Sequence, residues 1–124
     1  MKRILVVDNE EYIQEAAQMC LETMAGWDVI TASSGREGLL IAEAEQPDAI
    51  LLDLIMPEMD GLMTFQRLQA NPSTQAIPVV LLTGDLQSAD SQTCRKLGIK
   101  AMIAKPFDPL TLAQQIASLL EWEQ

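Results

Sequence analysis

Asp53 is the residue of this chain with the clearest sign of chemistry, because it ends a short apolar run over residues 49–52. A run of this length that stops at a turn signal is typical of a strand covered by helices on both faces. Asp53 then lies at the carboxyl edge of a parallel sheet, where open α/β sheets bind their ligands. A single aspartate there is more often a helix cap or a solvated strand end, so its neighbours decide the interpretation.

Polar side chains follow the other strand-like runs in the same way. They come from three segments of the chain, which are residues 8–10 (Asp8, Asn9 and Glu10), Thr83 and Lys105. Because the carboxyl ends of parallel strands meet at one edge of a sheet, we expect these side chains to lie near Asp53. Each of them alone has an ordinary structural explanation, whereas together they form a chemical set.

That set fits the transfer of a phosphoryl group. Asp53 offers a nucleophilic oxygen, while the hydroxyl group of Thr83 and the ammonium group of Lys105 can hold phosphoryl oxygens. The acidic residues supply the oxygen ligands that Mg²⁺ prefers. Two carboxylates about 5 Å apart repel each other by roughly 3 kcal/mol at an effective dielectric constant of about 20. A bound divalent cation relieves that repulsion and neutralises an incoming phosphate group.

The rest of the sequence must position these groups, and it alternates between strand-like and helical patterns. This alternation predicts an α/β fold with a parallel sheet and right-handed crossovers. The predicted strands cover residues 3–8, 27–31, 48–53, 77–82 and 101–104. The predicted helices cover residues 10–24, 34–45, 60–70, 86–97 and 108–122, the last with Asp108 as its cap and Pro109 in its first turn.

Length and charge restrict what the chain binds. Its 124 residues, 48% of them hydrophobic, suit one globular domain, and we expect residues 1–124 to be a single module without an output domain. A net charge of −10 argues against nucleic acid and anionic membranes as partners, since basic residues gather only in a small group, Arg95, Lys96 and Lys100. Without a long apolar run or a signal peptide, a cytoplasmic protein is expected.

The histidine and cysteine content excludes further chemistry. The chain has no histidine, which removes His-based catalysis and most zinc sites. Its two cysteines, Cys20 and Cys94, lack the spacing of a metal or redox motif and lie in helical patterns, where a buried thiol is expected. In a doubly wound fold the helices that carry them cover opposite faces of the sheet, so we expect no disulfide between them.

The order of four motifs, VVDNE, LLDLIMPEMDG, VVLLTGD and AKPF, resembles the receiver domains of two-component response regulators over essentially the whole chain. The spacing from Asp8 to Asp53, and then to Thr83 and Lys105, fits that family throughout. The resemblance, above all to single-domain, chemotaxis-regulator-like members, implies a flavodoxin-like, doubly wound parallel sheet of five strands in the order 2-1-3-4-5, with five helices.

The resemblance also implies a function and its partners. The chain would be a phosphoacceptor signalling switch and not an enzyme: a histidine kinase or histidine phosphotransfer protein phosphorylates Asp53, and a downstream target protein reads the result. Self-phosphorylation from phosphohistidine would depend on Mg²⁺, and self-dephosphorylation would be slow. Lys105 would pair with the phosphoryl group, Thr83 would sense it, and the peptide bond between Lys105 and Pro106 would be cis.

For the Mg²⁺ ion, the resemblance implies a site made by Asp8, Asn9, Asp53 and the backbone carbonyl of Ile55. Asn9 departs from the family pattern, because an acidic residue that touches the metal directly is usual at its position. Ile55 is also the second residue after Asp53, a position that is often polar in members with fast hydrolysis. The first departure bears on metal affinity and the second on phosphoryl lifetime, while the acceptor stays in place.

A third departure concerns the switch itself. In the family an aromatic residue three positions before the lysine moves together with the threonine, whereas this chain has Met102 there. Methionine fills space in several rotamers, so we expect a smaller rearrangement that is carried by Thr83, the loop after it and the fourth helix. The family's usual output face is made by the fourth helix, the fifth strand and the fifth helix, where Trp122 is either a contact or a cover for the core.

Three alternatives remain to be compared with this interpretation. A hydrolase of the haloacid dehalogenase type needs a second aspartate two residues after the nucleophile, where this chain has Ile55. A flavodoxin needs a phosphate-binding loop where this chain has the acidic residues 8–11. The alternative that stays open is a receiver-like interaction module that works independently of phosphorylation, because Asn9 and Met102 are both losses from the family pattern.

Overall fold

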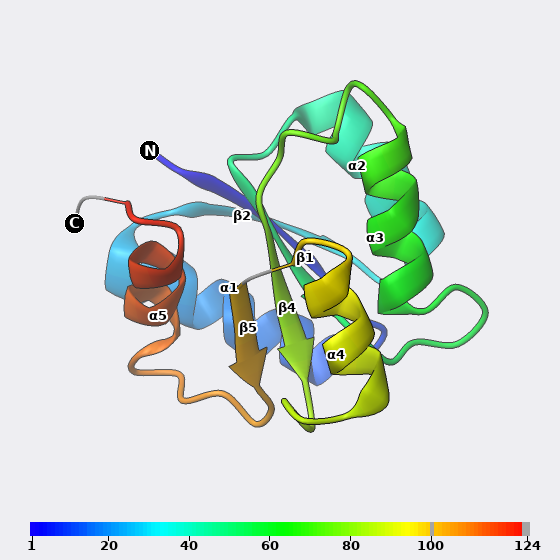
Figure 1. The fold of residues 1–124 in the computed structure, drawn as a ribbon. Helices are drawn as coiled ribbons and strands as arrows, with labels where there is room; N and C mark the ends of the chain where they lie inside the picture. Colours follow the sequence, from blue (N-terminus) through cyan, green and yellow to red (C-terminus); the bar gives the residue numbers. More distant parts are fainter. Residues whose placement is uncertain (100, 123–124) are drawn as a thin grey trace.

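The computed structural model describes residues 1–99 and 101–122, which form one parallel sheet between two layers of helices (Figure 1). The strands are β1 (Arg3–Val7), β2 (Asp28–Ala32), β3 (Ala49–Asp53), β4 (Val79–Thr83) and β5 (Ala101–Ala104). The helices are α1 (Glu11–Ala25), α2 (Gly35–Glu45), α3 (Gly61–Ala70), α4 (Ala89–Lys96) and α5 (Leu112–Leu119). Neighbouring strands are parallel and follow the order β2-β1-β3-β4-β5. The predicted flavodoxin-like, doubly wound fold is confirmed.

The two faces of the sheet have separate apolar cores. Along β1, Ile4 and Val6 join the core under α1 and α5, whereas Leu5 and Val7 join the core under α2, α3 and α4. Every residue of β3 and of β4 is buried. Strands that are covered by helices on both faces have this continuous apolar pattern. The last residues of these strands therefore lie where little water reaches them.

The two cysteines lie on opposite faces of the sheet, as the sequence predicts. Cys20 of α1 belongs to the core under α1 and α5, whereas Cys94 of α4 belongs to the core on the other face. Both thiols are free and buried, and burial raises the pKa of each above the ordinary value for cysteine. They are packing residues of two different cores.

Short polar side chains begin α2, α3 and α4. Ser34, Asp60 and Ser88 each accept a hydrogen bond from a backbone N–H group in the first turn of their helix, as N-cap residues do. At the end of α1, Gly26 has a φ of 70°, a left-handed conformation that glycine adopts without strain. These local signals explain why the predicted bounds of α1, α2 and α3 agree with the structure to within one residue.

The predicted bounds were wrong for α4 and α5, which are both shorter than their helical patterns. The helix expected over residues 108–122 covers only Leu112–Leu119. The Asp108 carboxylate accepts a hydrogen bond from the N–H group of Leu110 at 2.9 Å, so it closes a turn before the helix and does not cap it. Similarly, the Asp85 carboxylate accepts from the N–H group of Gln87 at 2.8 Å, and α4 begins only after this turn.

Trp122 lies beyond the end of α5 and covers one end of the core under α1 and α5. Its ring meets that of Trp27 edge to face, with centroids 5.3 Å apart and planes at 83°. The ammonium nitrogen of Lys2 lies 4.6 Å from the centroid of the Trp122 ring. Both contacts are favourable for an indole ring. The structure therefore favours a core-covering role for Trp122 over an exposed output contact.

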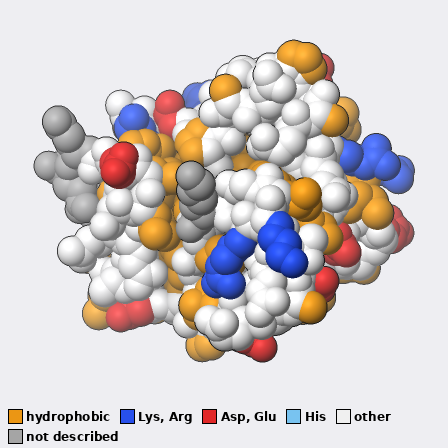
Figure 2. Space-filling model, viewed as in Figure 1, with side chains coloured by type: hydrophobic (Ala, Val, Ile, Leu, Met, Phe, Trp, Pro, Cys, Tyr) orange, Lys and Arg blue, Asp and Glu red, His pale blue; other side chains and the backbone are white. Residues whose placement is uncertain are grey.

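The face of the molecule in Figure 2 carries few basic side chains, and some of them gather over α4, whose last turn contains Arg95 and Lys96. Lys100, the third member of the basic group identified in the sequence, lies outside the described residues. Within the described part of the chain, no helix combines the length and the apolar character that crossing a membrane requires.

Candidate functional site

One ammonium group joins three carboxylates at the carboxyl edge of the sheet. Nζ of Lys105 lies 3.2 Å from Oδ2 of Asp8, 3.2 Å from Oδ1 of Asp53 and 3.4 Å from Oε1 of Glu10. Hydrogen bonds between charged groups are stronger than neutral ones. These four residues are named the acidic centre below. The structure thus brings together Asp8, Asp53 and Lys105, which the sequence places at the ends of three different strands.

The parallel register of the strands explains this meeting. Asp53 is the last residue of β3, and Asp8 directly follows β1, its neighbour in the sheet. Lys105 directly follows β5, and its backbone N–H group donates a 2.8 Å hydrogen bond to the carbonyl of Thr83 at the end of β4. The long side chain of Lys105 then reaches past β4 to the carboxylates that follow β3 and β1.

Asp8 is held by a second layer of hydrogen bonds and is 0% exposed. Its Oδ1 accepts from the backbone N–H group of Glu10 at 2.8 Å. Its backbone carbonyl accepts from Nε2 of Gln14 at 2.6 Å, and the same nitrogen lies 3.1 Å from Oγ of Ser33. Gln14 was not predicted from the sequence. In the sequence, Gln14 is marked only as a polar residue beside the apolar stripe of the first helix. Its role becomes clear in the structure, where Ser33 of the β2–α2 loop lies within hydrogen-bond distance of it.

The electrostatics of the acidic centre favour a neutral Asp53 more than usual. Burial, and then the nearby Asp8 carboxylate, raise the pKa of Asp53 from 3.8 to about 6, although Lys105 and the backbone of Ile55 act in the opposite direction. Burial alone would lower the pKa of Lys105, but Asp53 and Asp8 raise it above the ordinary lysine value. At neutral pH Asp53 is therefore mostly ionised and lies beside a charged ammonium group.

Glu10 is the outermost member of the acidic centre, and it is tied to Tyr12. The hydroxyl group of Tyr12 donates to Oε2 of Glu10 at 2.6 Å. This hydrogen bond, with the help of Lys105, holds the pKa of Glu10 below its usual value, and it also raises the pKa of Tyr12. Glu10 thus remains an anion that competes with Asp8 and Asp53 for the Lys105 ammonium group.

Thr83 is buried and bonded to α4. Its Oγ1 lies 3.2 Å from Oγ of Ser91 and 3.2 Å from the carbonyl oxygen of Asp85. Oγ of Ser91 also donates to that carbonyl at 2.8 Å and accepts from the hydroxyl group of Ser88 at 2.9 Å. Thr83, Ser88 and Ser91 are named the hydroxyl cluster below. Among residues 1–99 and 101–122, Thr83 makes no side-chain hydrogen bond with the acidic centre.

The residues expected at the metal site are placed unequally. Asp8 and Asp53 are buried and both face the ammonium group of Lys105. By contrast, the side chain of Asn9 is exposed, and Ile55 is 73% exposed. Only the backbone carbonyl of Ile55 could contribute there. In the part of the chain that the structure describes, no three His, Cys, Asp or Glu side chains form a preformed metal cluster. The point on which the carboxylates converge is taken by Lys105.

Gly61 allows the loop after β3 to fold back tightly. A Cβ atom at Gly61 would lie 2.3 Å from the carbonyl oxygen of Asp53 and 2.6 Å from Cα of Leu54. The N–H group of Gly61 donates to the carbonyl of Leu54 at 2.7 Å. By contrast, a Cβ atom at Gly84, in the loop after β4, would meet nothing within 4 Å. The backbone around the acceptor is therefore packed closely, and that beyond Thr83 is open.

Met102 lies on β5 and is half-buried, and it packs against the core under α2, α3 and α4. In the sheet, Met102 is paired with Leu81 of β4, and Ala104 is paired with Thr83. Because side chains alternate along a strand, Met102 and Ala104 occupy the same face of the sheet. The expected cis peptide bond is present between Lys105 and Pro106. The predicted place of Met102 on the fifth strand and the predicted cis peptide bond are confirmed, whereas the role of Met102 in switching stays a prediction.

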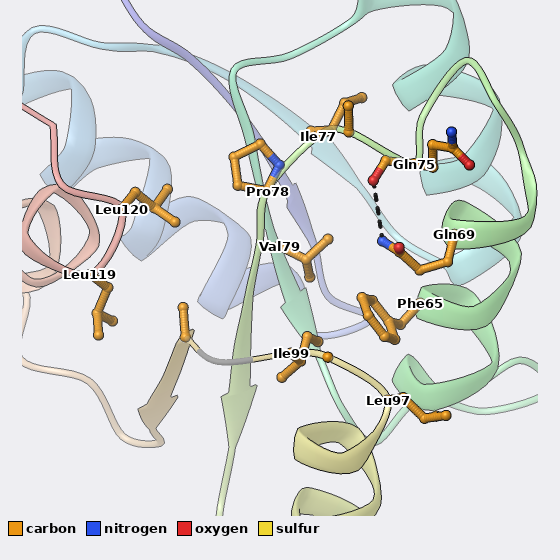
Figure 3. Close-up of a pocket in the computed structure, with 13 residues that line it drawn as sticks. Phe65, Gln69, Gln75, Ile77, Pro78, Val79, Leu97, Ile99, Leu119 and Leu120 are labelled. Atoms are coloured by element: carbon orange, nitrogen blue, oxygen red, sulfur yellow. Dashed lines mark hydrogen bonds between the residues drawn. The ribbon is translucent and has the colours of Figure 1, made fainter.

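An apolar hollow lies at the opposite edge of the sheet. It is lined by residues that precede or begin β4 and β5, together with side chains of α3 and α5, and Figure 3 shows Phe65, Val79 and Ile99 around it. A side-chain hydrogen bond from Nε2 of Gln69 to the carbonyl of Gln75 spans one side. Among residues 1–99 and 101–122, the side chains that line this hollow are uncharged, unlike those of the acidic centre.

Known proteins are similar to this chain in sequence and in fold. A family model described as the response regulator receiver domain matches residues 4–117. The alkaline phosphatase synthesis transcriptional regulatory protein PhoP of Bacillus subtilis is 38% identical over 119 residues, which are 96% of this chain and 48% of PhoP. Protein PilH of Pseudomonas aeruginosa is 32% identical over 120 residues, which are 97% of this chain and 98% of PilH.

Among solved structures, chemotaxis protein CheY4 of Vibrio cholerae matches with a TM-score of 0.87 and 28% identity, over 96% of this chain and 98% of that chain. A CheY-like response regulator receiver domain protein of Methanospirillum hungatei also matches with a TM-score of 0.87 and 28% identity, over 98% and 94% of the two chains. The chain spans about half the length of PhoP and of several related transcriptional regulators, whereas its match to PilH runs along nearly all of that protein.

Proposed function

We propose, since the chain belongs to the response regulator receiver domain family, that it is a phosphoacceptor signalling switch of a two-component phosphorelay with Asp53 as the acceptor. The observation that carries this proposal is the position of Asp53 itself. It is only 3% exposed, it ends a buried strand, and its Oδ1 lies 3.2 Å from the Lys105 ammonium group. Perturbed carboxylates in such surroundings are frequent at functional sites.

In the proposed transfer, an ionised oxygen of Asp53 attacks the phosphorus atom of a phosphohistidine on the donor protein. A bond forms between phosphorus and the Asp53 oxygen, the phosphorus–nitrogen bond breaks, and its electron pair stays on the donor's imidazole ring. With a pKa of about 6, Asp53 is mostly ionised at neutral pH and can act as the nucleophile. Lys105 offsets the negative charge that the phosphoryl group brings.

The donor set at this edge suits Mg²⁺. Asp8 and Asp53 present two buried carboxylates, and a single ammonium group compensates the three negative charges of the acidic centre. Hard oxygen ligands of this kind, with water completing the coordination, are what Mg²⁺ requires. We assign its binding to Asp8, Asp53, the amide oxygen of Asn9 and the backbone carbonyl of Ile55. The ion, when bound, would neutralise the incoming phosphate.

The proposal extends to partners and location. The donor is a histidine kinase or a histidine phosphotransfer protein, and the phosphorylated state is read by a downstream target protein through direct contact. We propose that the domain works in the cytoplasm and that its own slow hydrolysis of the acyl phosphate resets it. A net charge of −10 opposes nucleic acid and anionic membranes as partners.

Acetyl phosphate tests the proposal without any partner protein. The wild-type protein, incubated with acetyl phosphate and Mg²⁺, should gain one phosphoryl group by intact mass, and EDTA should prevent the gain. An interaction module that works independently of phosphorylation, the alternative raised by Asn9 and Met102, would gain no mass under either condition. Phosphate uptake that EDTA leaves unchanged would contradict the assigned role of Mg²⁺.

A further inference from the structure

The predicted switch residue, Thr83, is held by a neighbour that the sequence does not mark as functional. Ser91, the third residue of α4, is 0% exposed, and its Oγ lies 3.2 Å from Oγ1 of Thr83. Buried hydroxyl groups need hydrogen-bond partners, and Ser91 finds all of its partners in the segment between Thr83 and the start of α4. This arrangement connects the end of β4 directly to the helix.

The three hydroxyl groups of the hydroxyl cluster have three protons, and the distances between them indicate which group donates and which accepts. Each hydroxyl group has one proton to donate and two lone pairs to accept with. The proton of Ser91 is used by its shortest contact, 2.8 Å to the carbonyl of Asp85, and the proton of Ser88 points to Ser91. The contact between Thr83 and Ser91 therefore uses the proton of Thr83, which Ser91 shares with the Asp85 carbonyl at the same distance of 3.2 Å. In this state Thr83 donates toward α4.

We propose that Ser91 is a positioning residue: its Oγ accepts a hydrogen bond from the Thr83 hydroxyl group in the unphosphorylated protein, and on phosphorylation Thr83 donates that hydrogen bond to a phosphoryl oxygen on Asp53 instead. This inference rests on the proposed function of Asp53. A phosphoryl oxygen is the stronger acceptor because it carries charge. Once Thr83 turns to it, Ser91 keeps its contacts with Asp85 and Ser88, while the side-chain link between β4 and α4 is lost.

This exchange gives the chain a route to α4 that needs no aromatic residue on β5. Met102 occupies that position on β5, whereas Ser91 connects Thr83 to α4 through atoms within hydrogen-bond distance. The element expected to respond is α4 (Ala89–Lys96) with the loop before it, because the bond that is exchanged ends there. β5 should respond less.

The variant Ser91→Ala isolates this bond without leaving a buried polar group unpaired. The Asp85 carbonyl still lies 3.2 Å from the Thr83 hydroxyl group, and Ser88 still accepts the backbone N–H group of residue 91, which caps α4. Loss of one of its two resting acceptors should weaken the restraint on Thr83. A replacement that merely damaged the fold would weaken binding at the acidic centre, whereas loss of a restraint on Thr83 should strengthen it.

The experiment measures binding of beryllofluoride, with Mg²⁺ present, by backbone amide chemical shifts. We expect Ser91→Ala to bind beryllofluoride about 2- to 10-fold more tightly than wild type, the factor that one neutral hydrogen bond provides. We also expect the shift changes of the α4 amides on binding to fall below half of their wild-type size. Equal or weaker binding, or an undiminished response of α4, would overturn the inference.

Two further variants separate this role from general packing. Thr93→Ala removes an exposed hydroxyl group of the same helix whose partner among the described residues is the carbonyl of Ala89, and this variant should bind beryllofluoride as wild type does. In the Thr83→Ala background, adding Ser91→Ala should produce no further tightening, because Ser91 acts through Thr83. Tightening in that background would overturn the inference. If Ser91→Ala does not fold, Ser91→Cys keeps the side-chain size with a much weaker hydrogen bond and allows the same comparison.

Labelling of the same samples by acetyl phosphate distinguishes the two proposals. A wild-type protein that takes up neither phosphate nor beryllofluoride would overturn both of them. A wild-type protein that is phosphorylated, together with a Ser91→Ala variant that behaves like it in binding and in the α4 shifts, would overturn only the role of Ser91.

Discussion

The acidic centre and the hydroxyl cluster follow neighbouring strands at one edge of the sheet, but they are held by different interactions. In the acidic centre, one ammonium group compensates three carboxylates, two of them buried. In the hydroxyl cluster, three neutral groups share three protons. Separating a buried charge from its partner costs several kcal/mol, whereas exchanging a neutral hydrogen bond costs about 1 kcal/mol. The first region therefore fixes where a phosphoryl group binds, and the second is suited to move.

Removal of the ammonium group should have the largest effect on chemistry. We expect Lys105→Ala to slow phosphorylation by acetyl phosphate on the order of 100-fold, because the incoming phosphate then meets three uncompensated carboxylates. Ser91→Ala should change this rate much less. The control is Lys96→Ala, which removes an exposed lysine from the last turn of α4. Similar rates in Lys105→Ala and Lys96→Ala would break the distinction between the two regions.

A matched pair of glycine substitutions should show that the two regions differ in rigidity. Gly61→Ala places a Cβ atom 2.3 Å from the carbonyl oxygen of Asp53, and we expect it to lower the free energy of unfolding by about 3 kcal/mol. Gly84→Ala has open space at its Cβ position and should change the stability by less than about 1 kcal/mol. Urea denaturation of both variants measures the difference. Equal losses would mean that the loop after β4 is packed as tightly as the loop after β3.

The charge of Asp53 should make the acidic centre sensitive to pH. Its pKa is raised from 3.8 to about 6 in the folded protein, so the folded state holds the proton more strongly than the unfolded chain does. The free energy of unfolding that this group contributes is present below about pH 4 and is lost as the pH rises through 6. At pH 7 without Mg²⁺, Asp53→Asn should therefore be more stable than wild type, on the order of 2 kcal/mol.

Thermal denaturation of wild type and Asp53→Asn between pH 4 and pH 7, in the presence of a chelator, measures this difference. The gap between the two proteins should widen as the pH rises. A gap that narrows, with wild type becoming the more stable protein at pH 7, would show that Lys105 stabilises ionised Asp53 by more than burial and Asp8 destabilise it.

The smallest effect is expected at Met102. Its flexible side chain packs against the core under α2, α3 and α4 and makes no hydrogen bond to the hydroxyl cluster among the described residues, so Met102→Ala should retain most of the amide shift changes that beryllofluoride causes. Thr83→Ala should lose the response in α4, because the donor of the exchanged bond is gone. Loss of the response in Met102→Ala, with retention in Thr83→Ala, would show that β5, and not the hydroxyl cluster, carries the switch.

The sequence predicts the acidic centre better than the hydroxyl cluster, and the reason is physical. A charged residue that ends an apolar run has few structural explanations, and the parallel order of the strands brings such residues to one edge. Asp8, Asp53 and Lys105 were therefore foreseen, although nothing in the sequence shows that Glu10 and Asn9 differ so much in their contact with Lys105.

Serine and glutamine carry no such signal, because they are common on helix surfaces. In the structure α4 begins only after the Asp85 turn, and Ser91, in the first turn of the helix, then lies within hydrogen-bond distance of Thr83 and of the Asp85 carbonyl. A similar turn around Asp108 delays the start of α5, and at its other end the helix stops at Leu119, before the positive φ of 58° at Glu121, so Trp122 lies outside it. Helical periodicity does not reveal a turn that is closed by a side-chain hydrogen bond. The starts of α4 and α5, and the contact between Ser91 and Thr83, were therefore not predicted.

The central claim, that Asp53 is the phosphoacceptor, is tested most directly by comparing the two ends of β3. Asp48 directly precedes this strand, is exposed, and accepts a hydrogen bond from the N–H group of Arg3 at 2.8 Å, whereas Asp53 ends it. The measurement is the rate of phosphorylation by acetyl phosphate with Mg²⁺, followed by intact mass. Asp48→Asn should be labelled at the wild-type rate and Asp53→Asn should not be labelled. Labelling of Asp53→Asn at the wild-type rate, with the same Mg²⁺ dependence, would contradict the account.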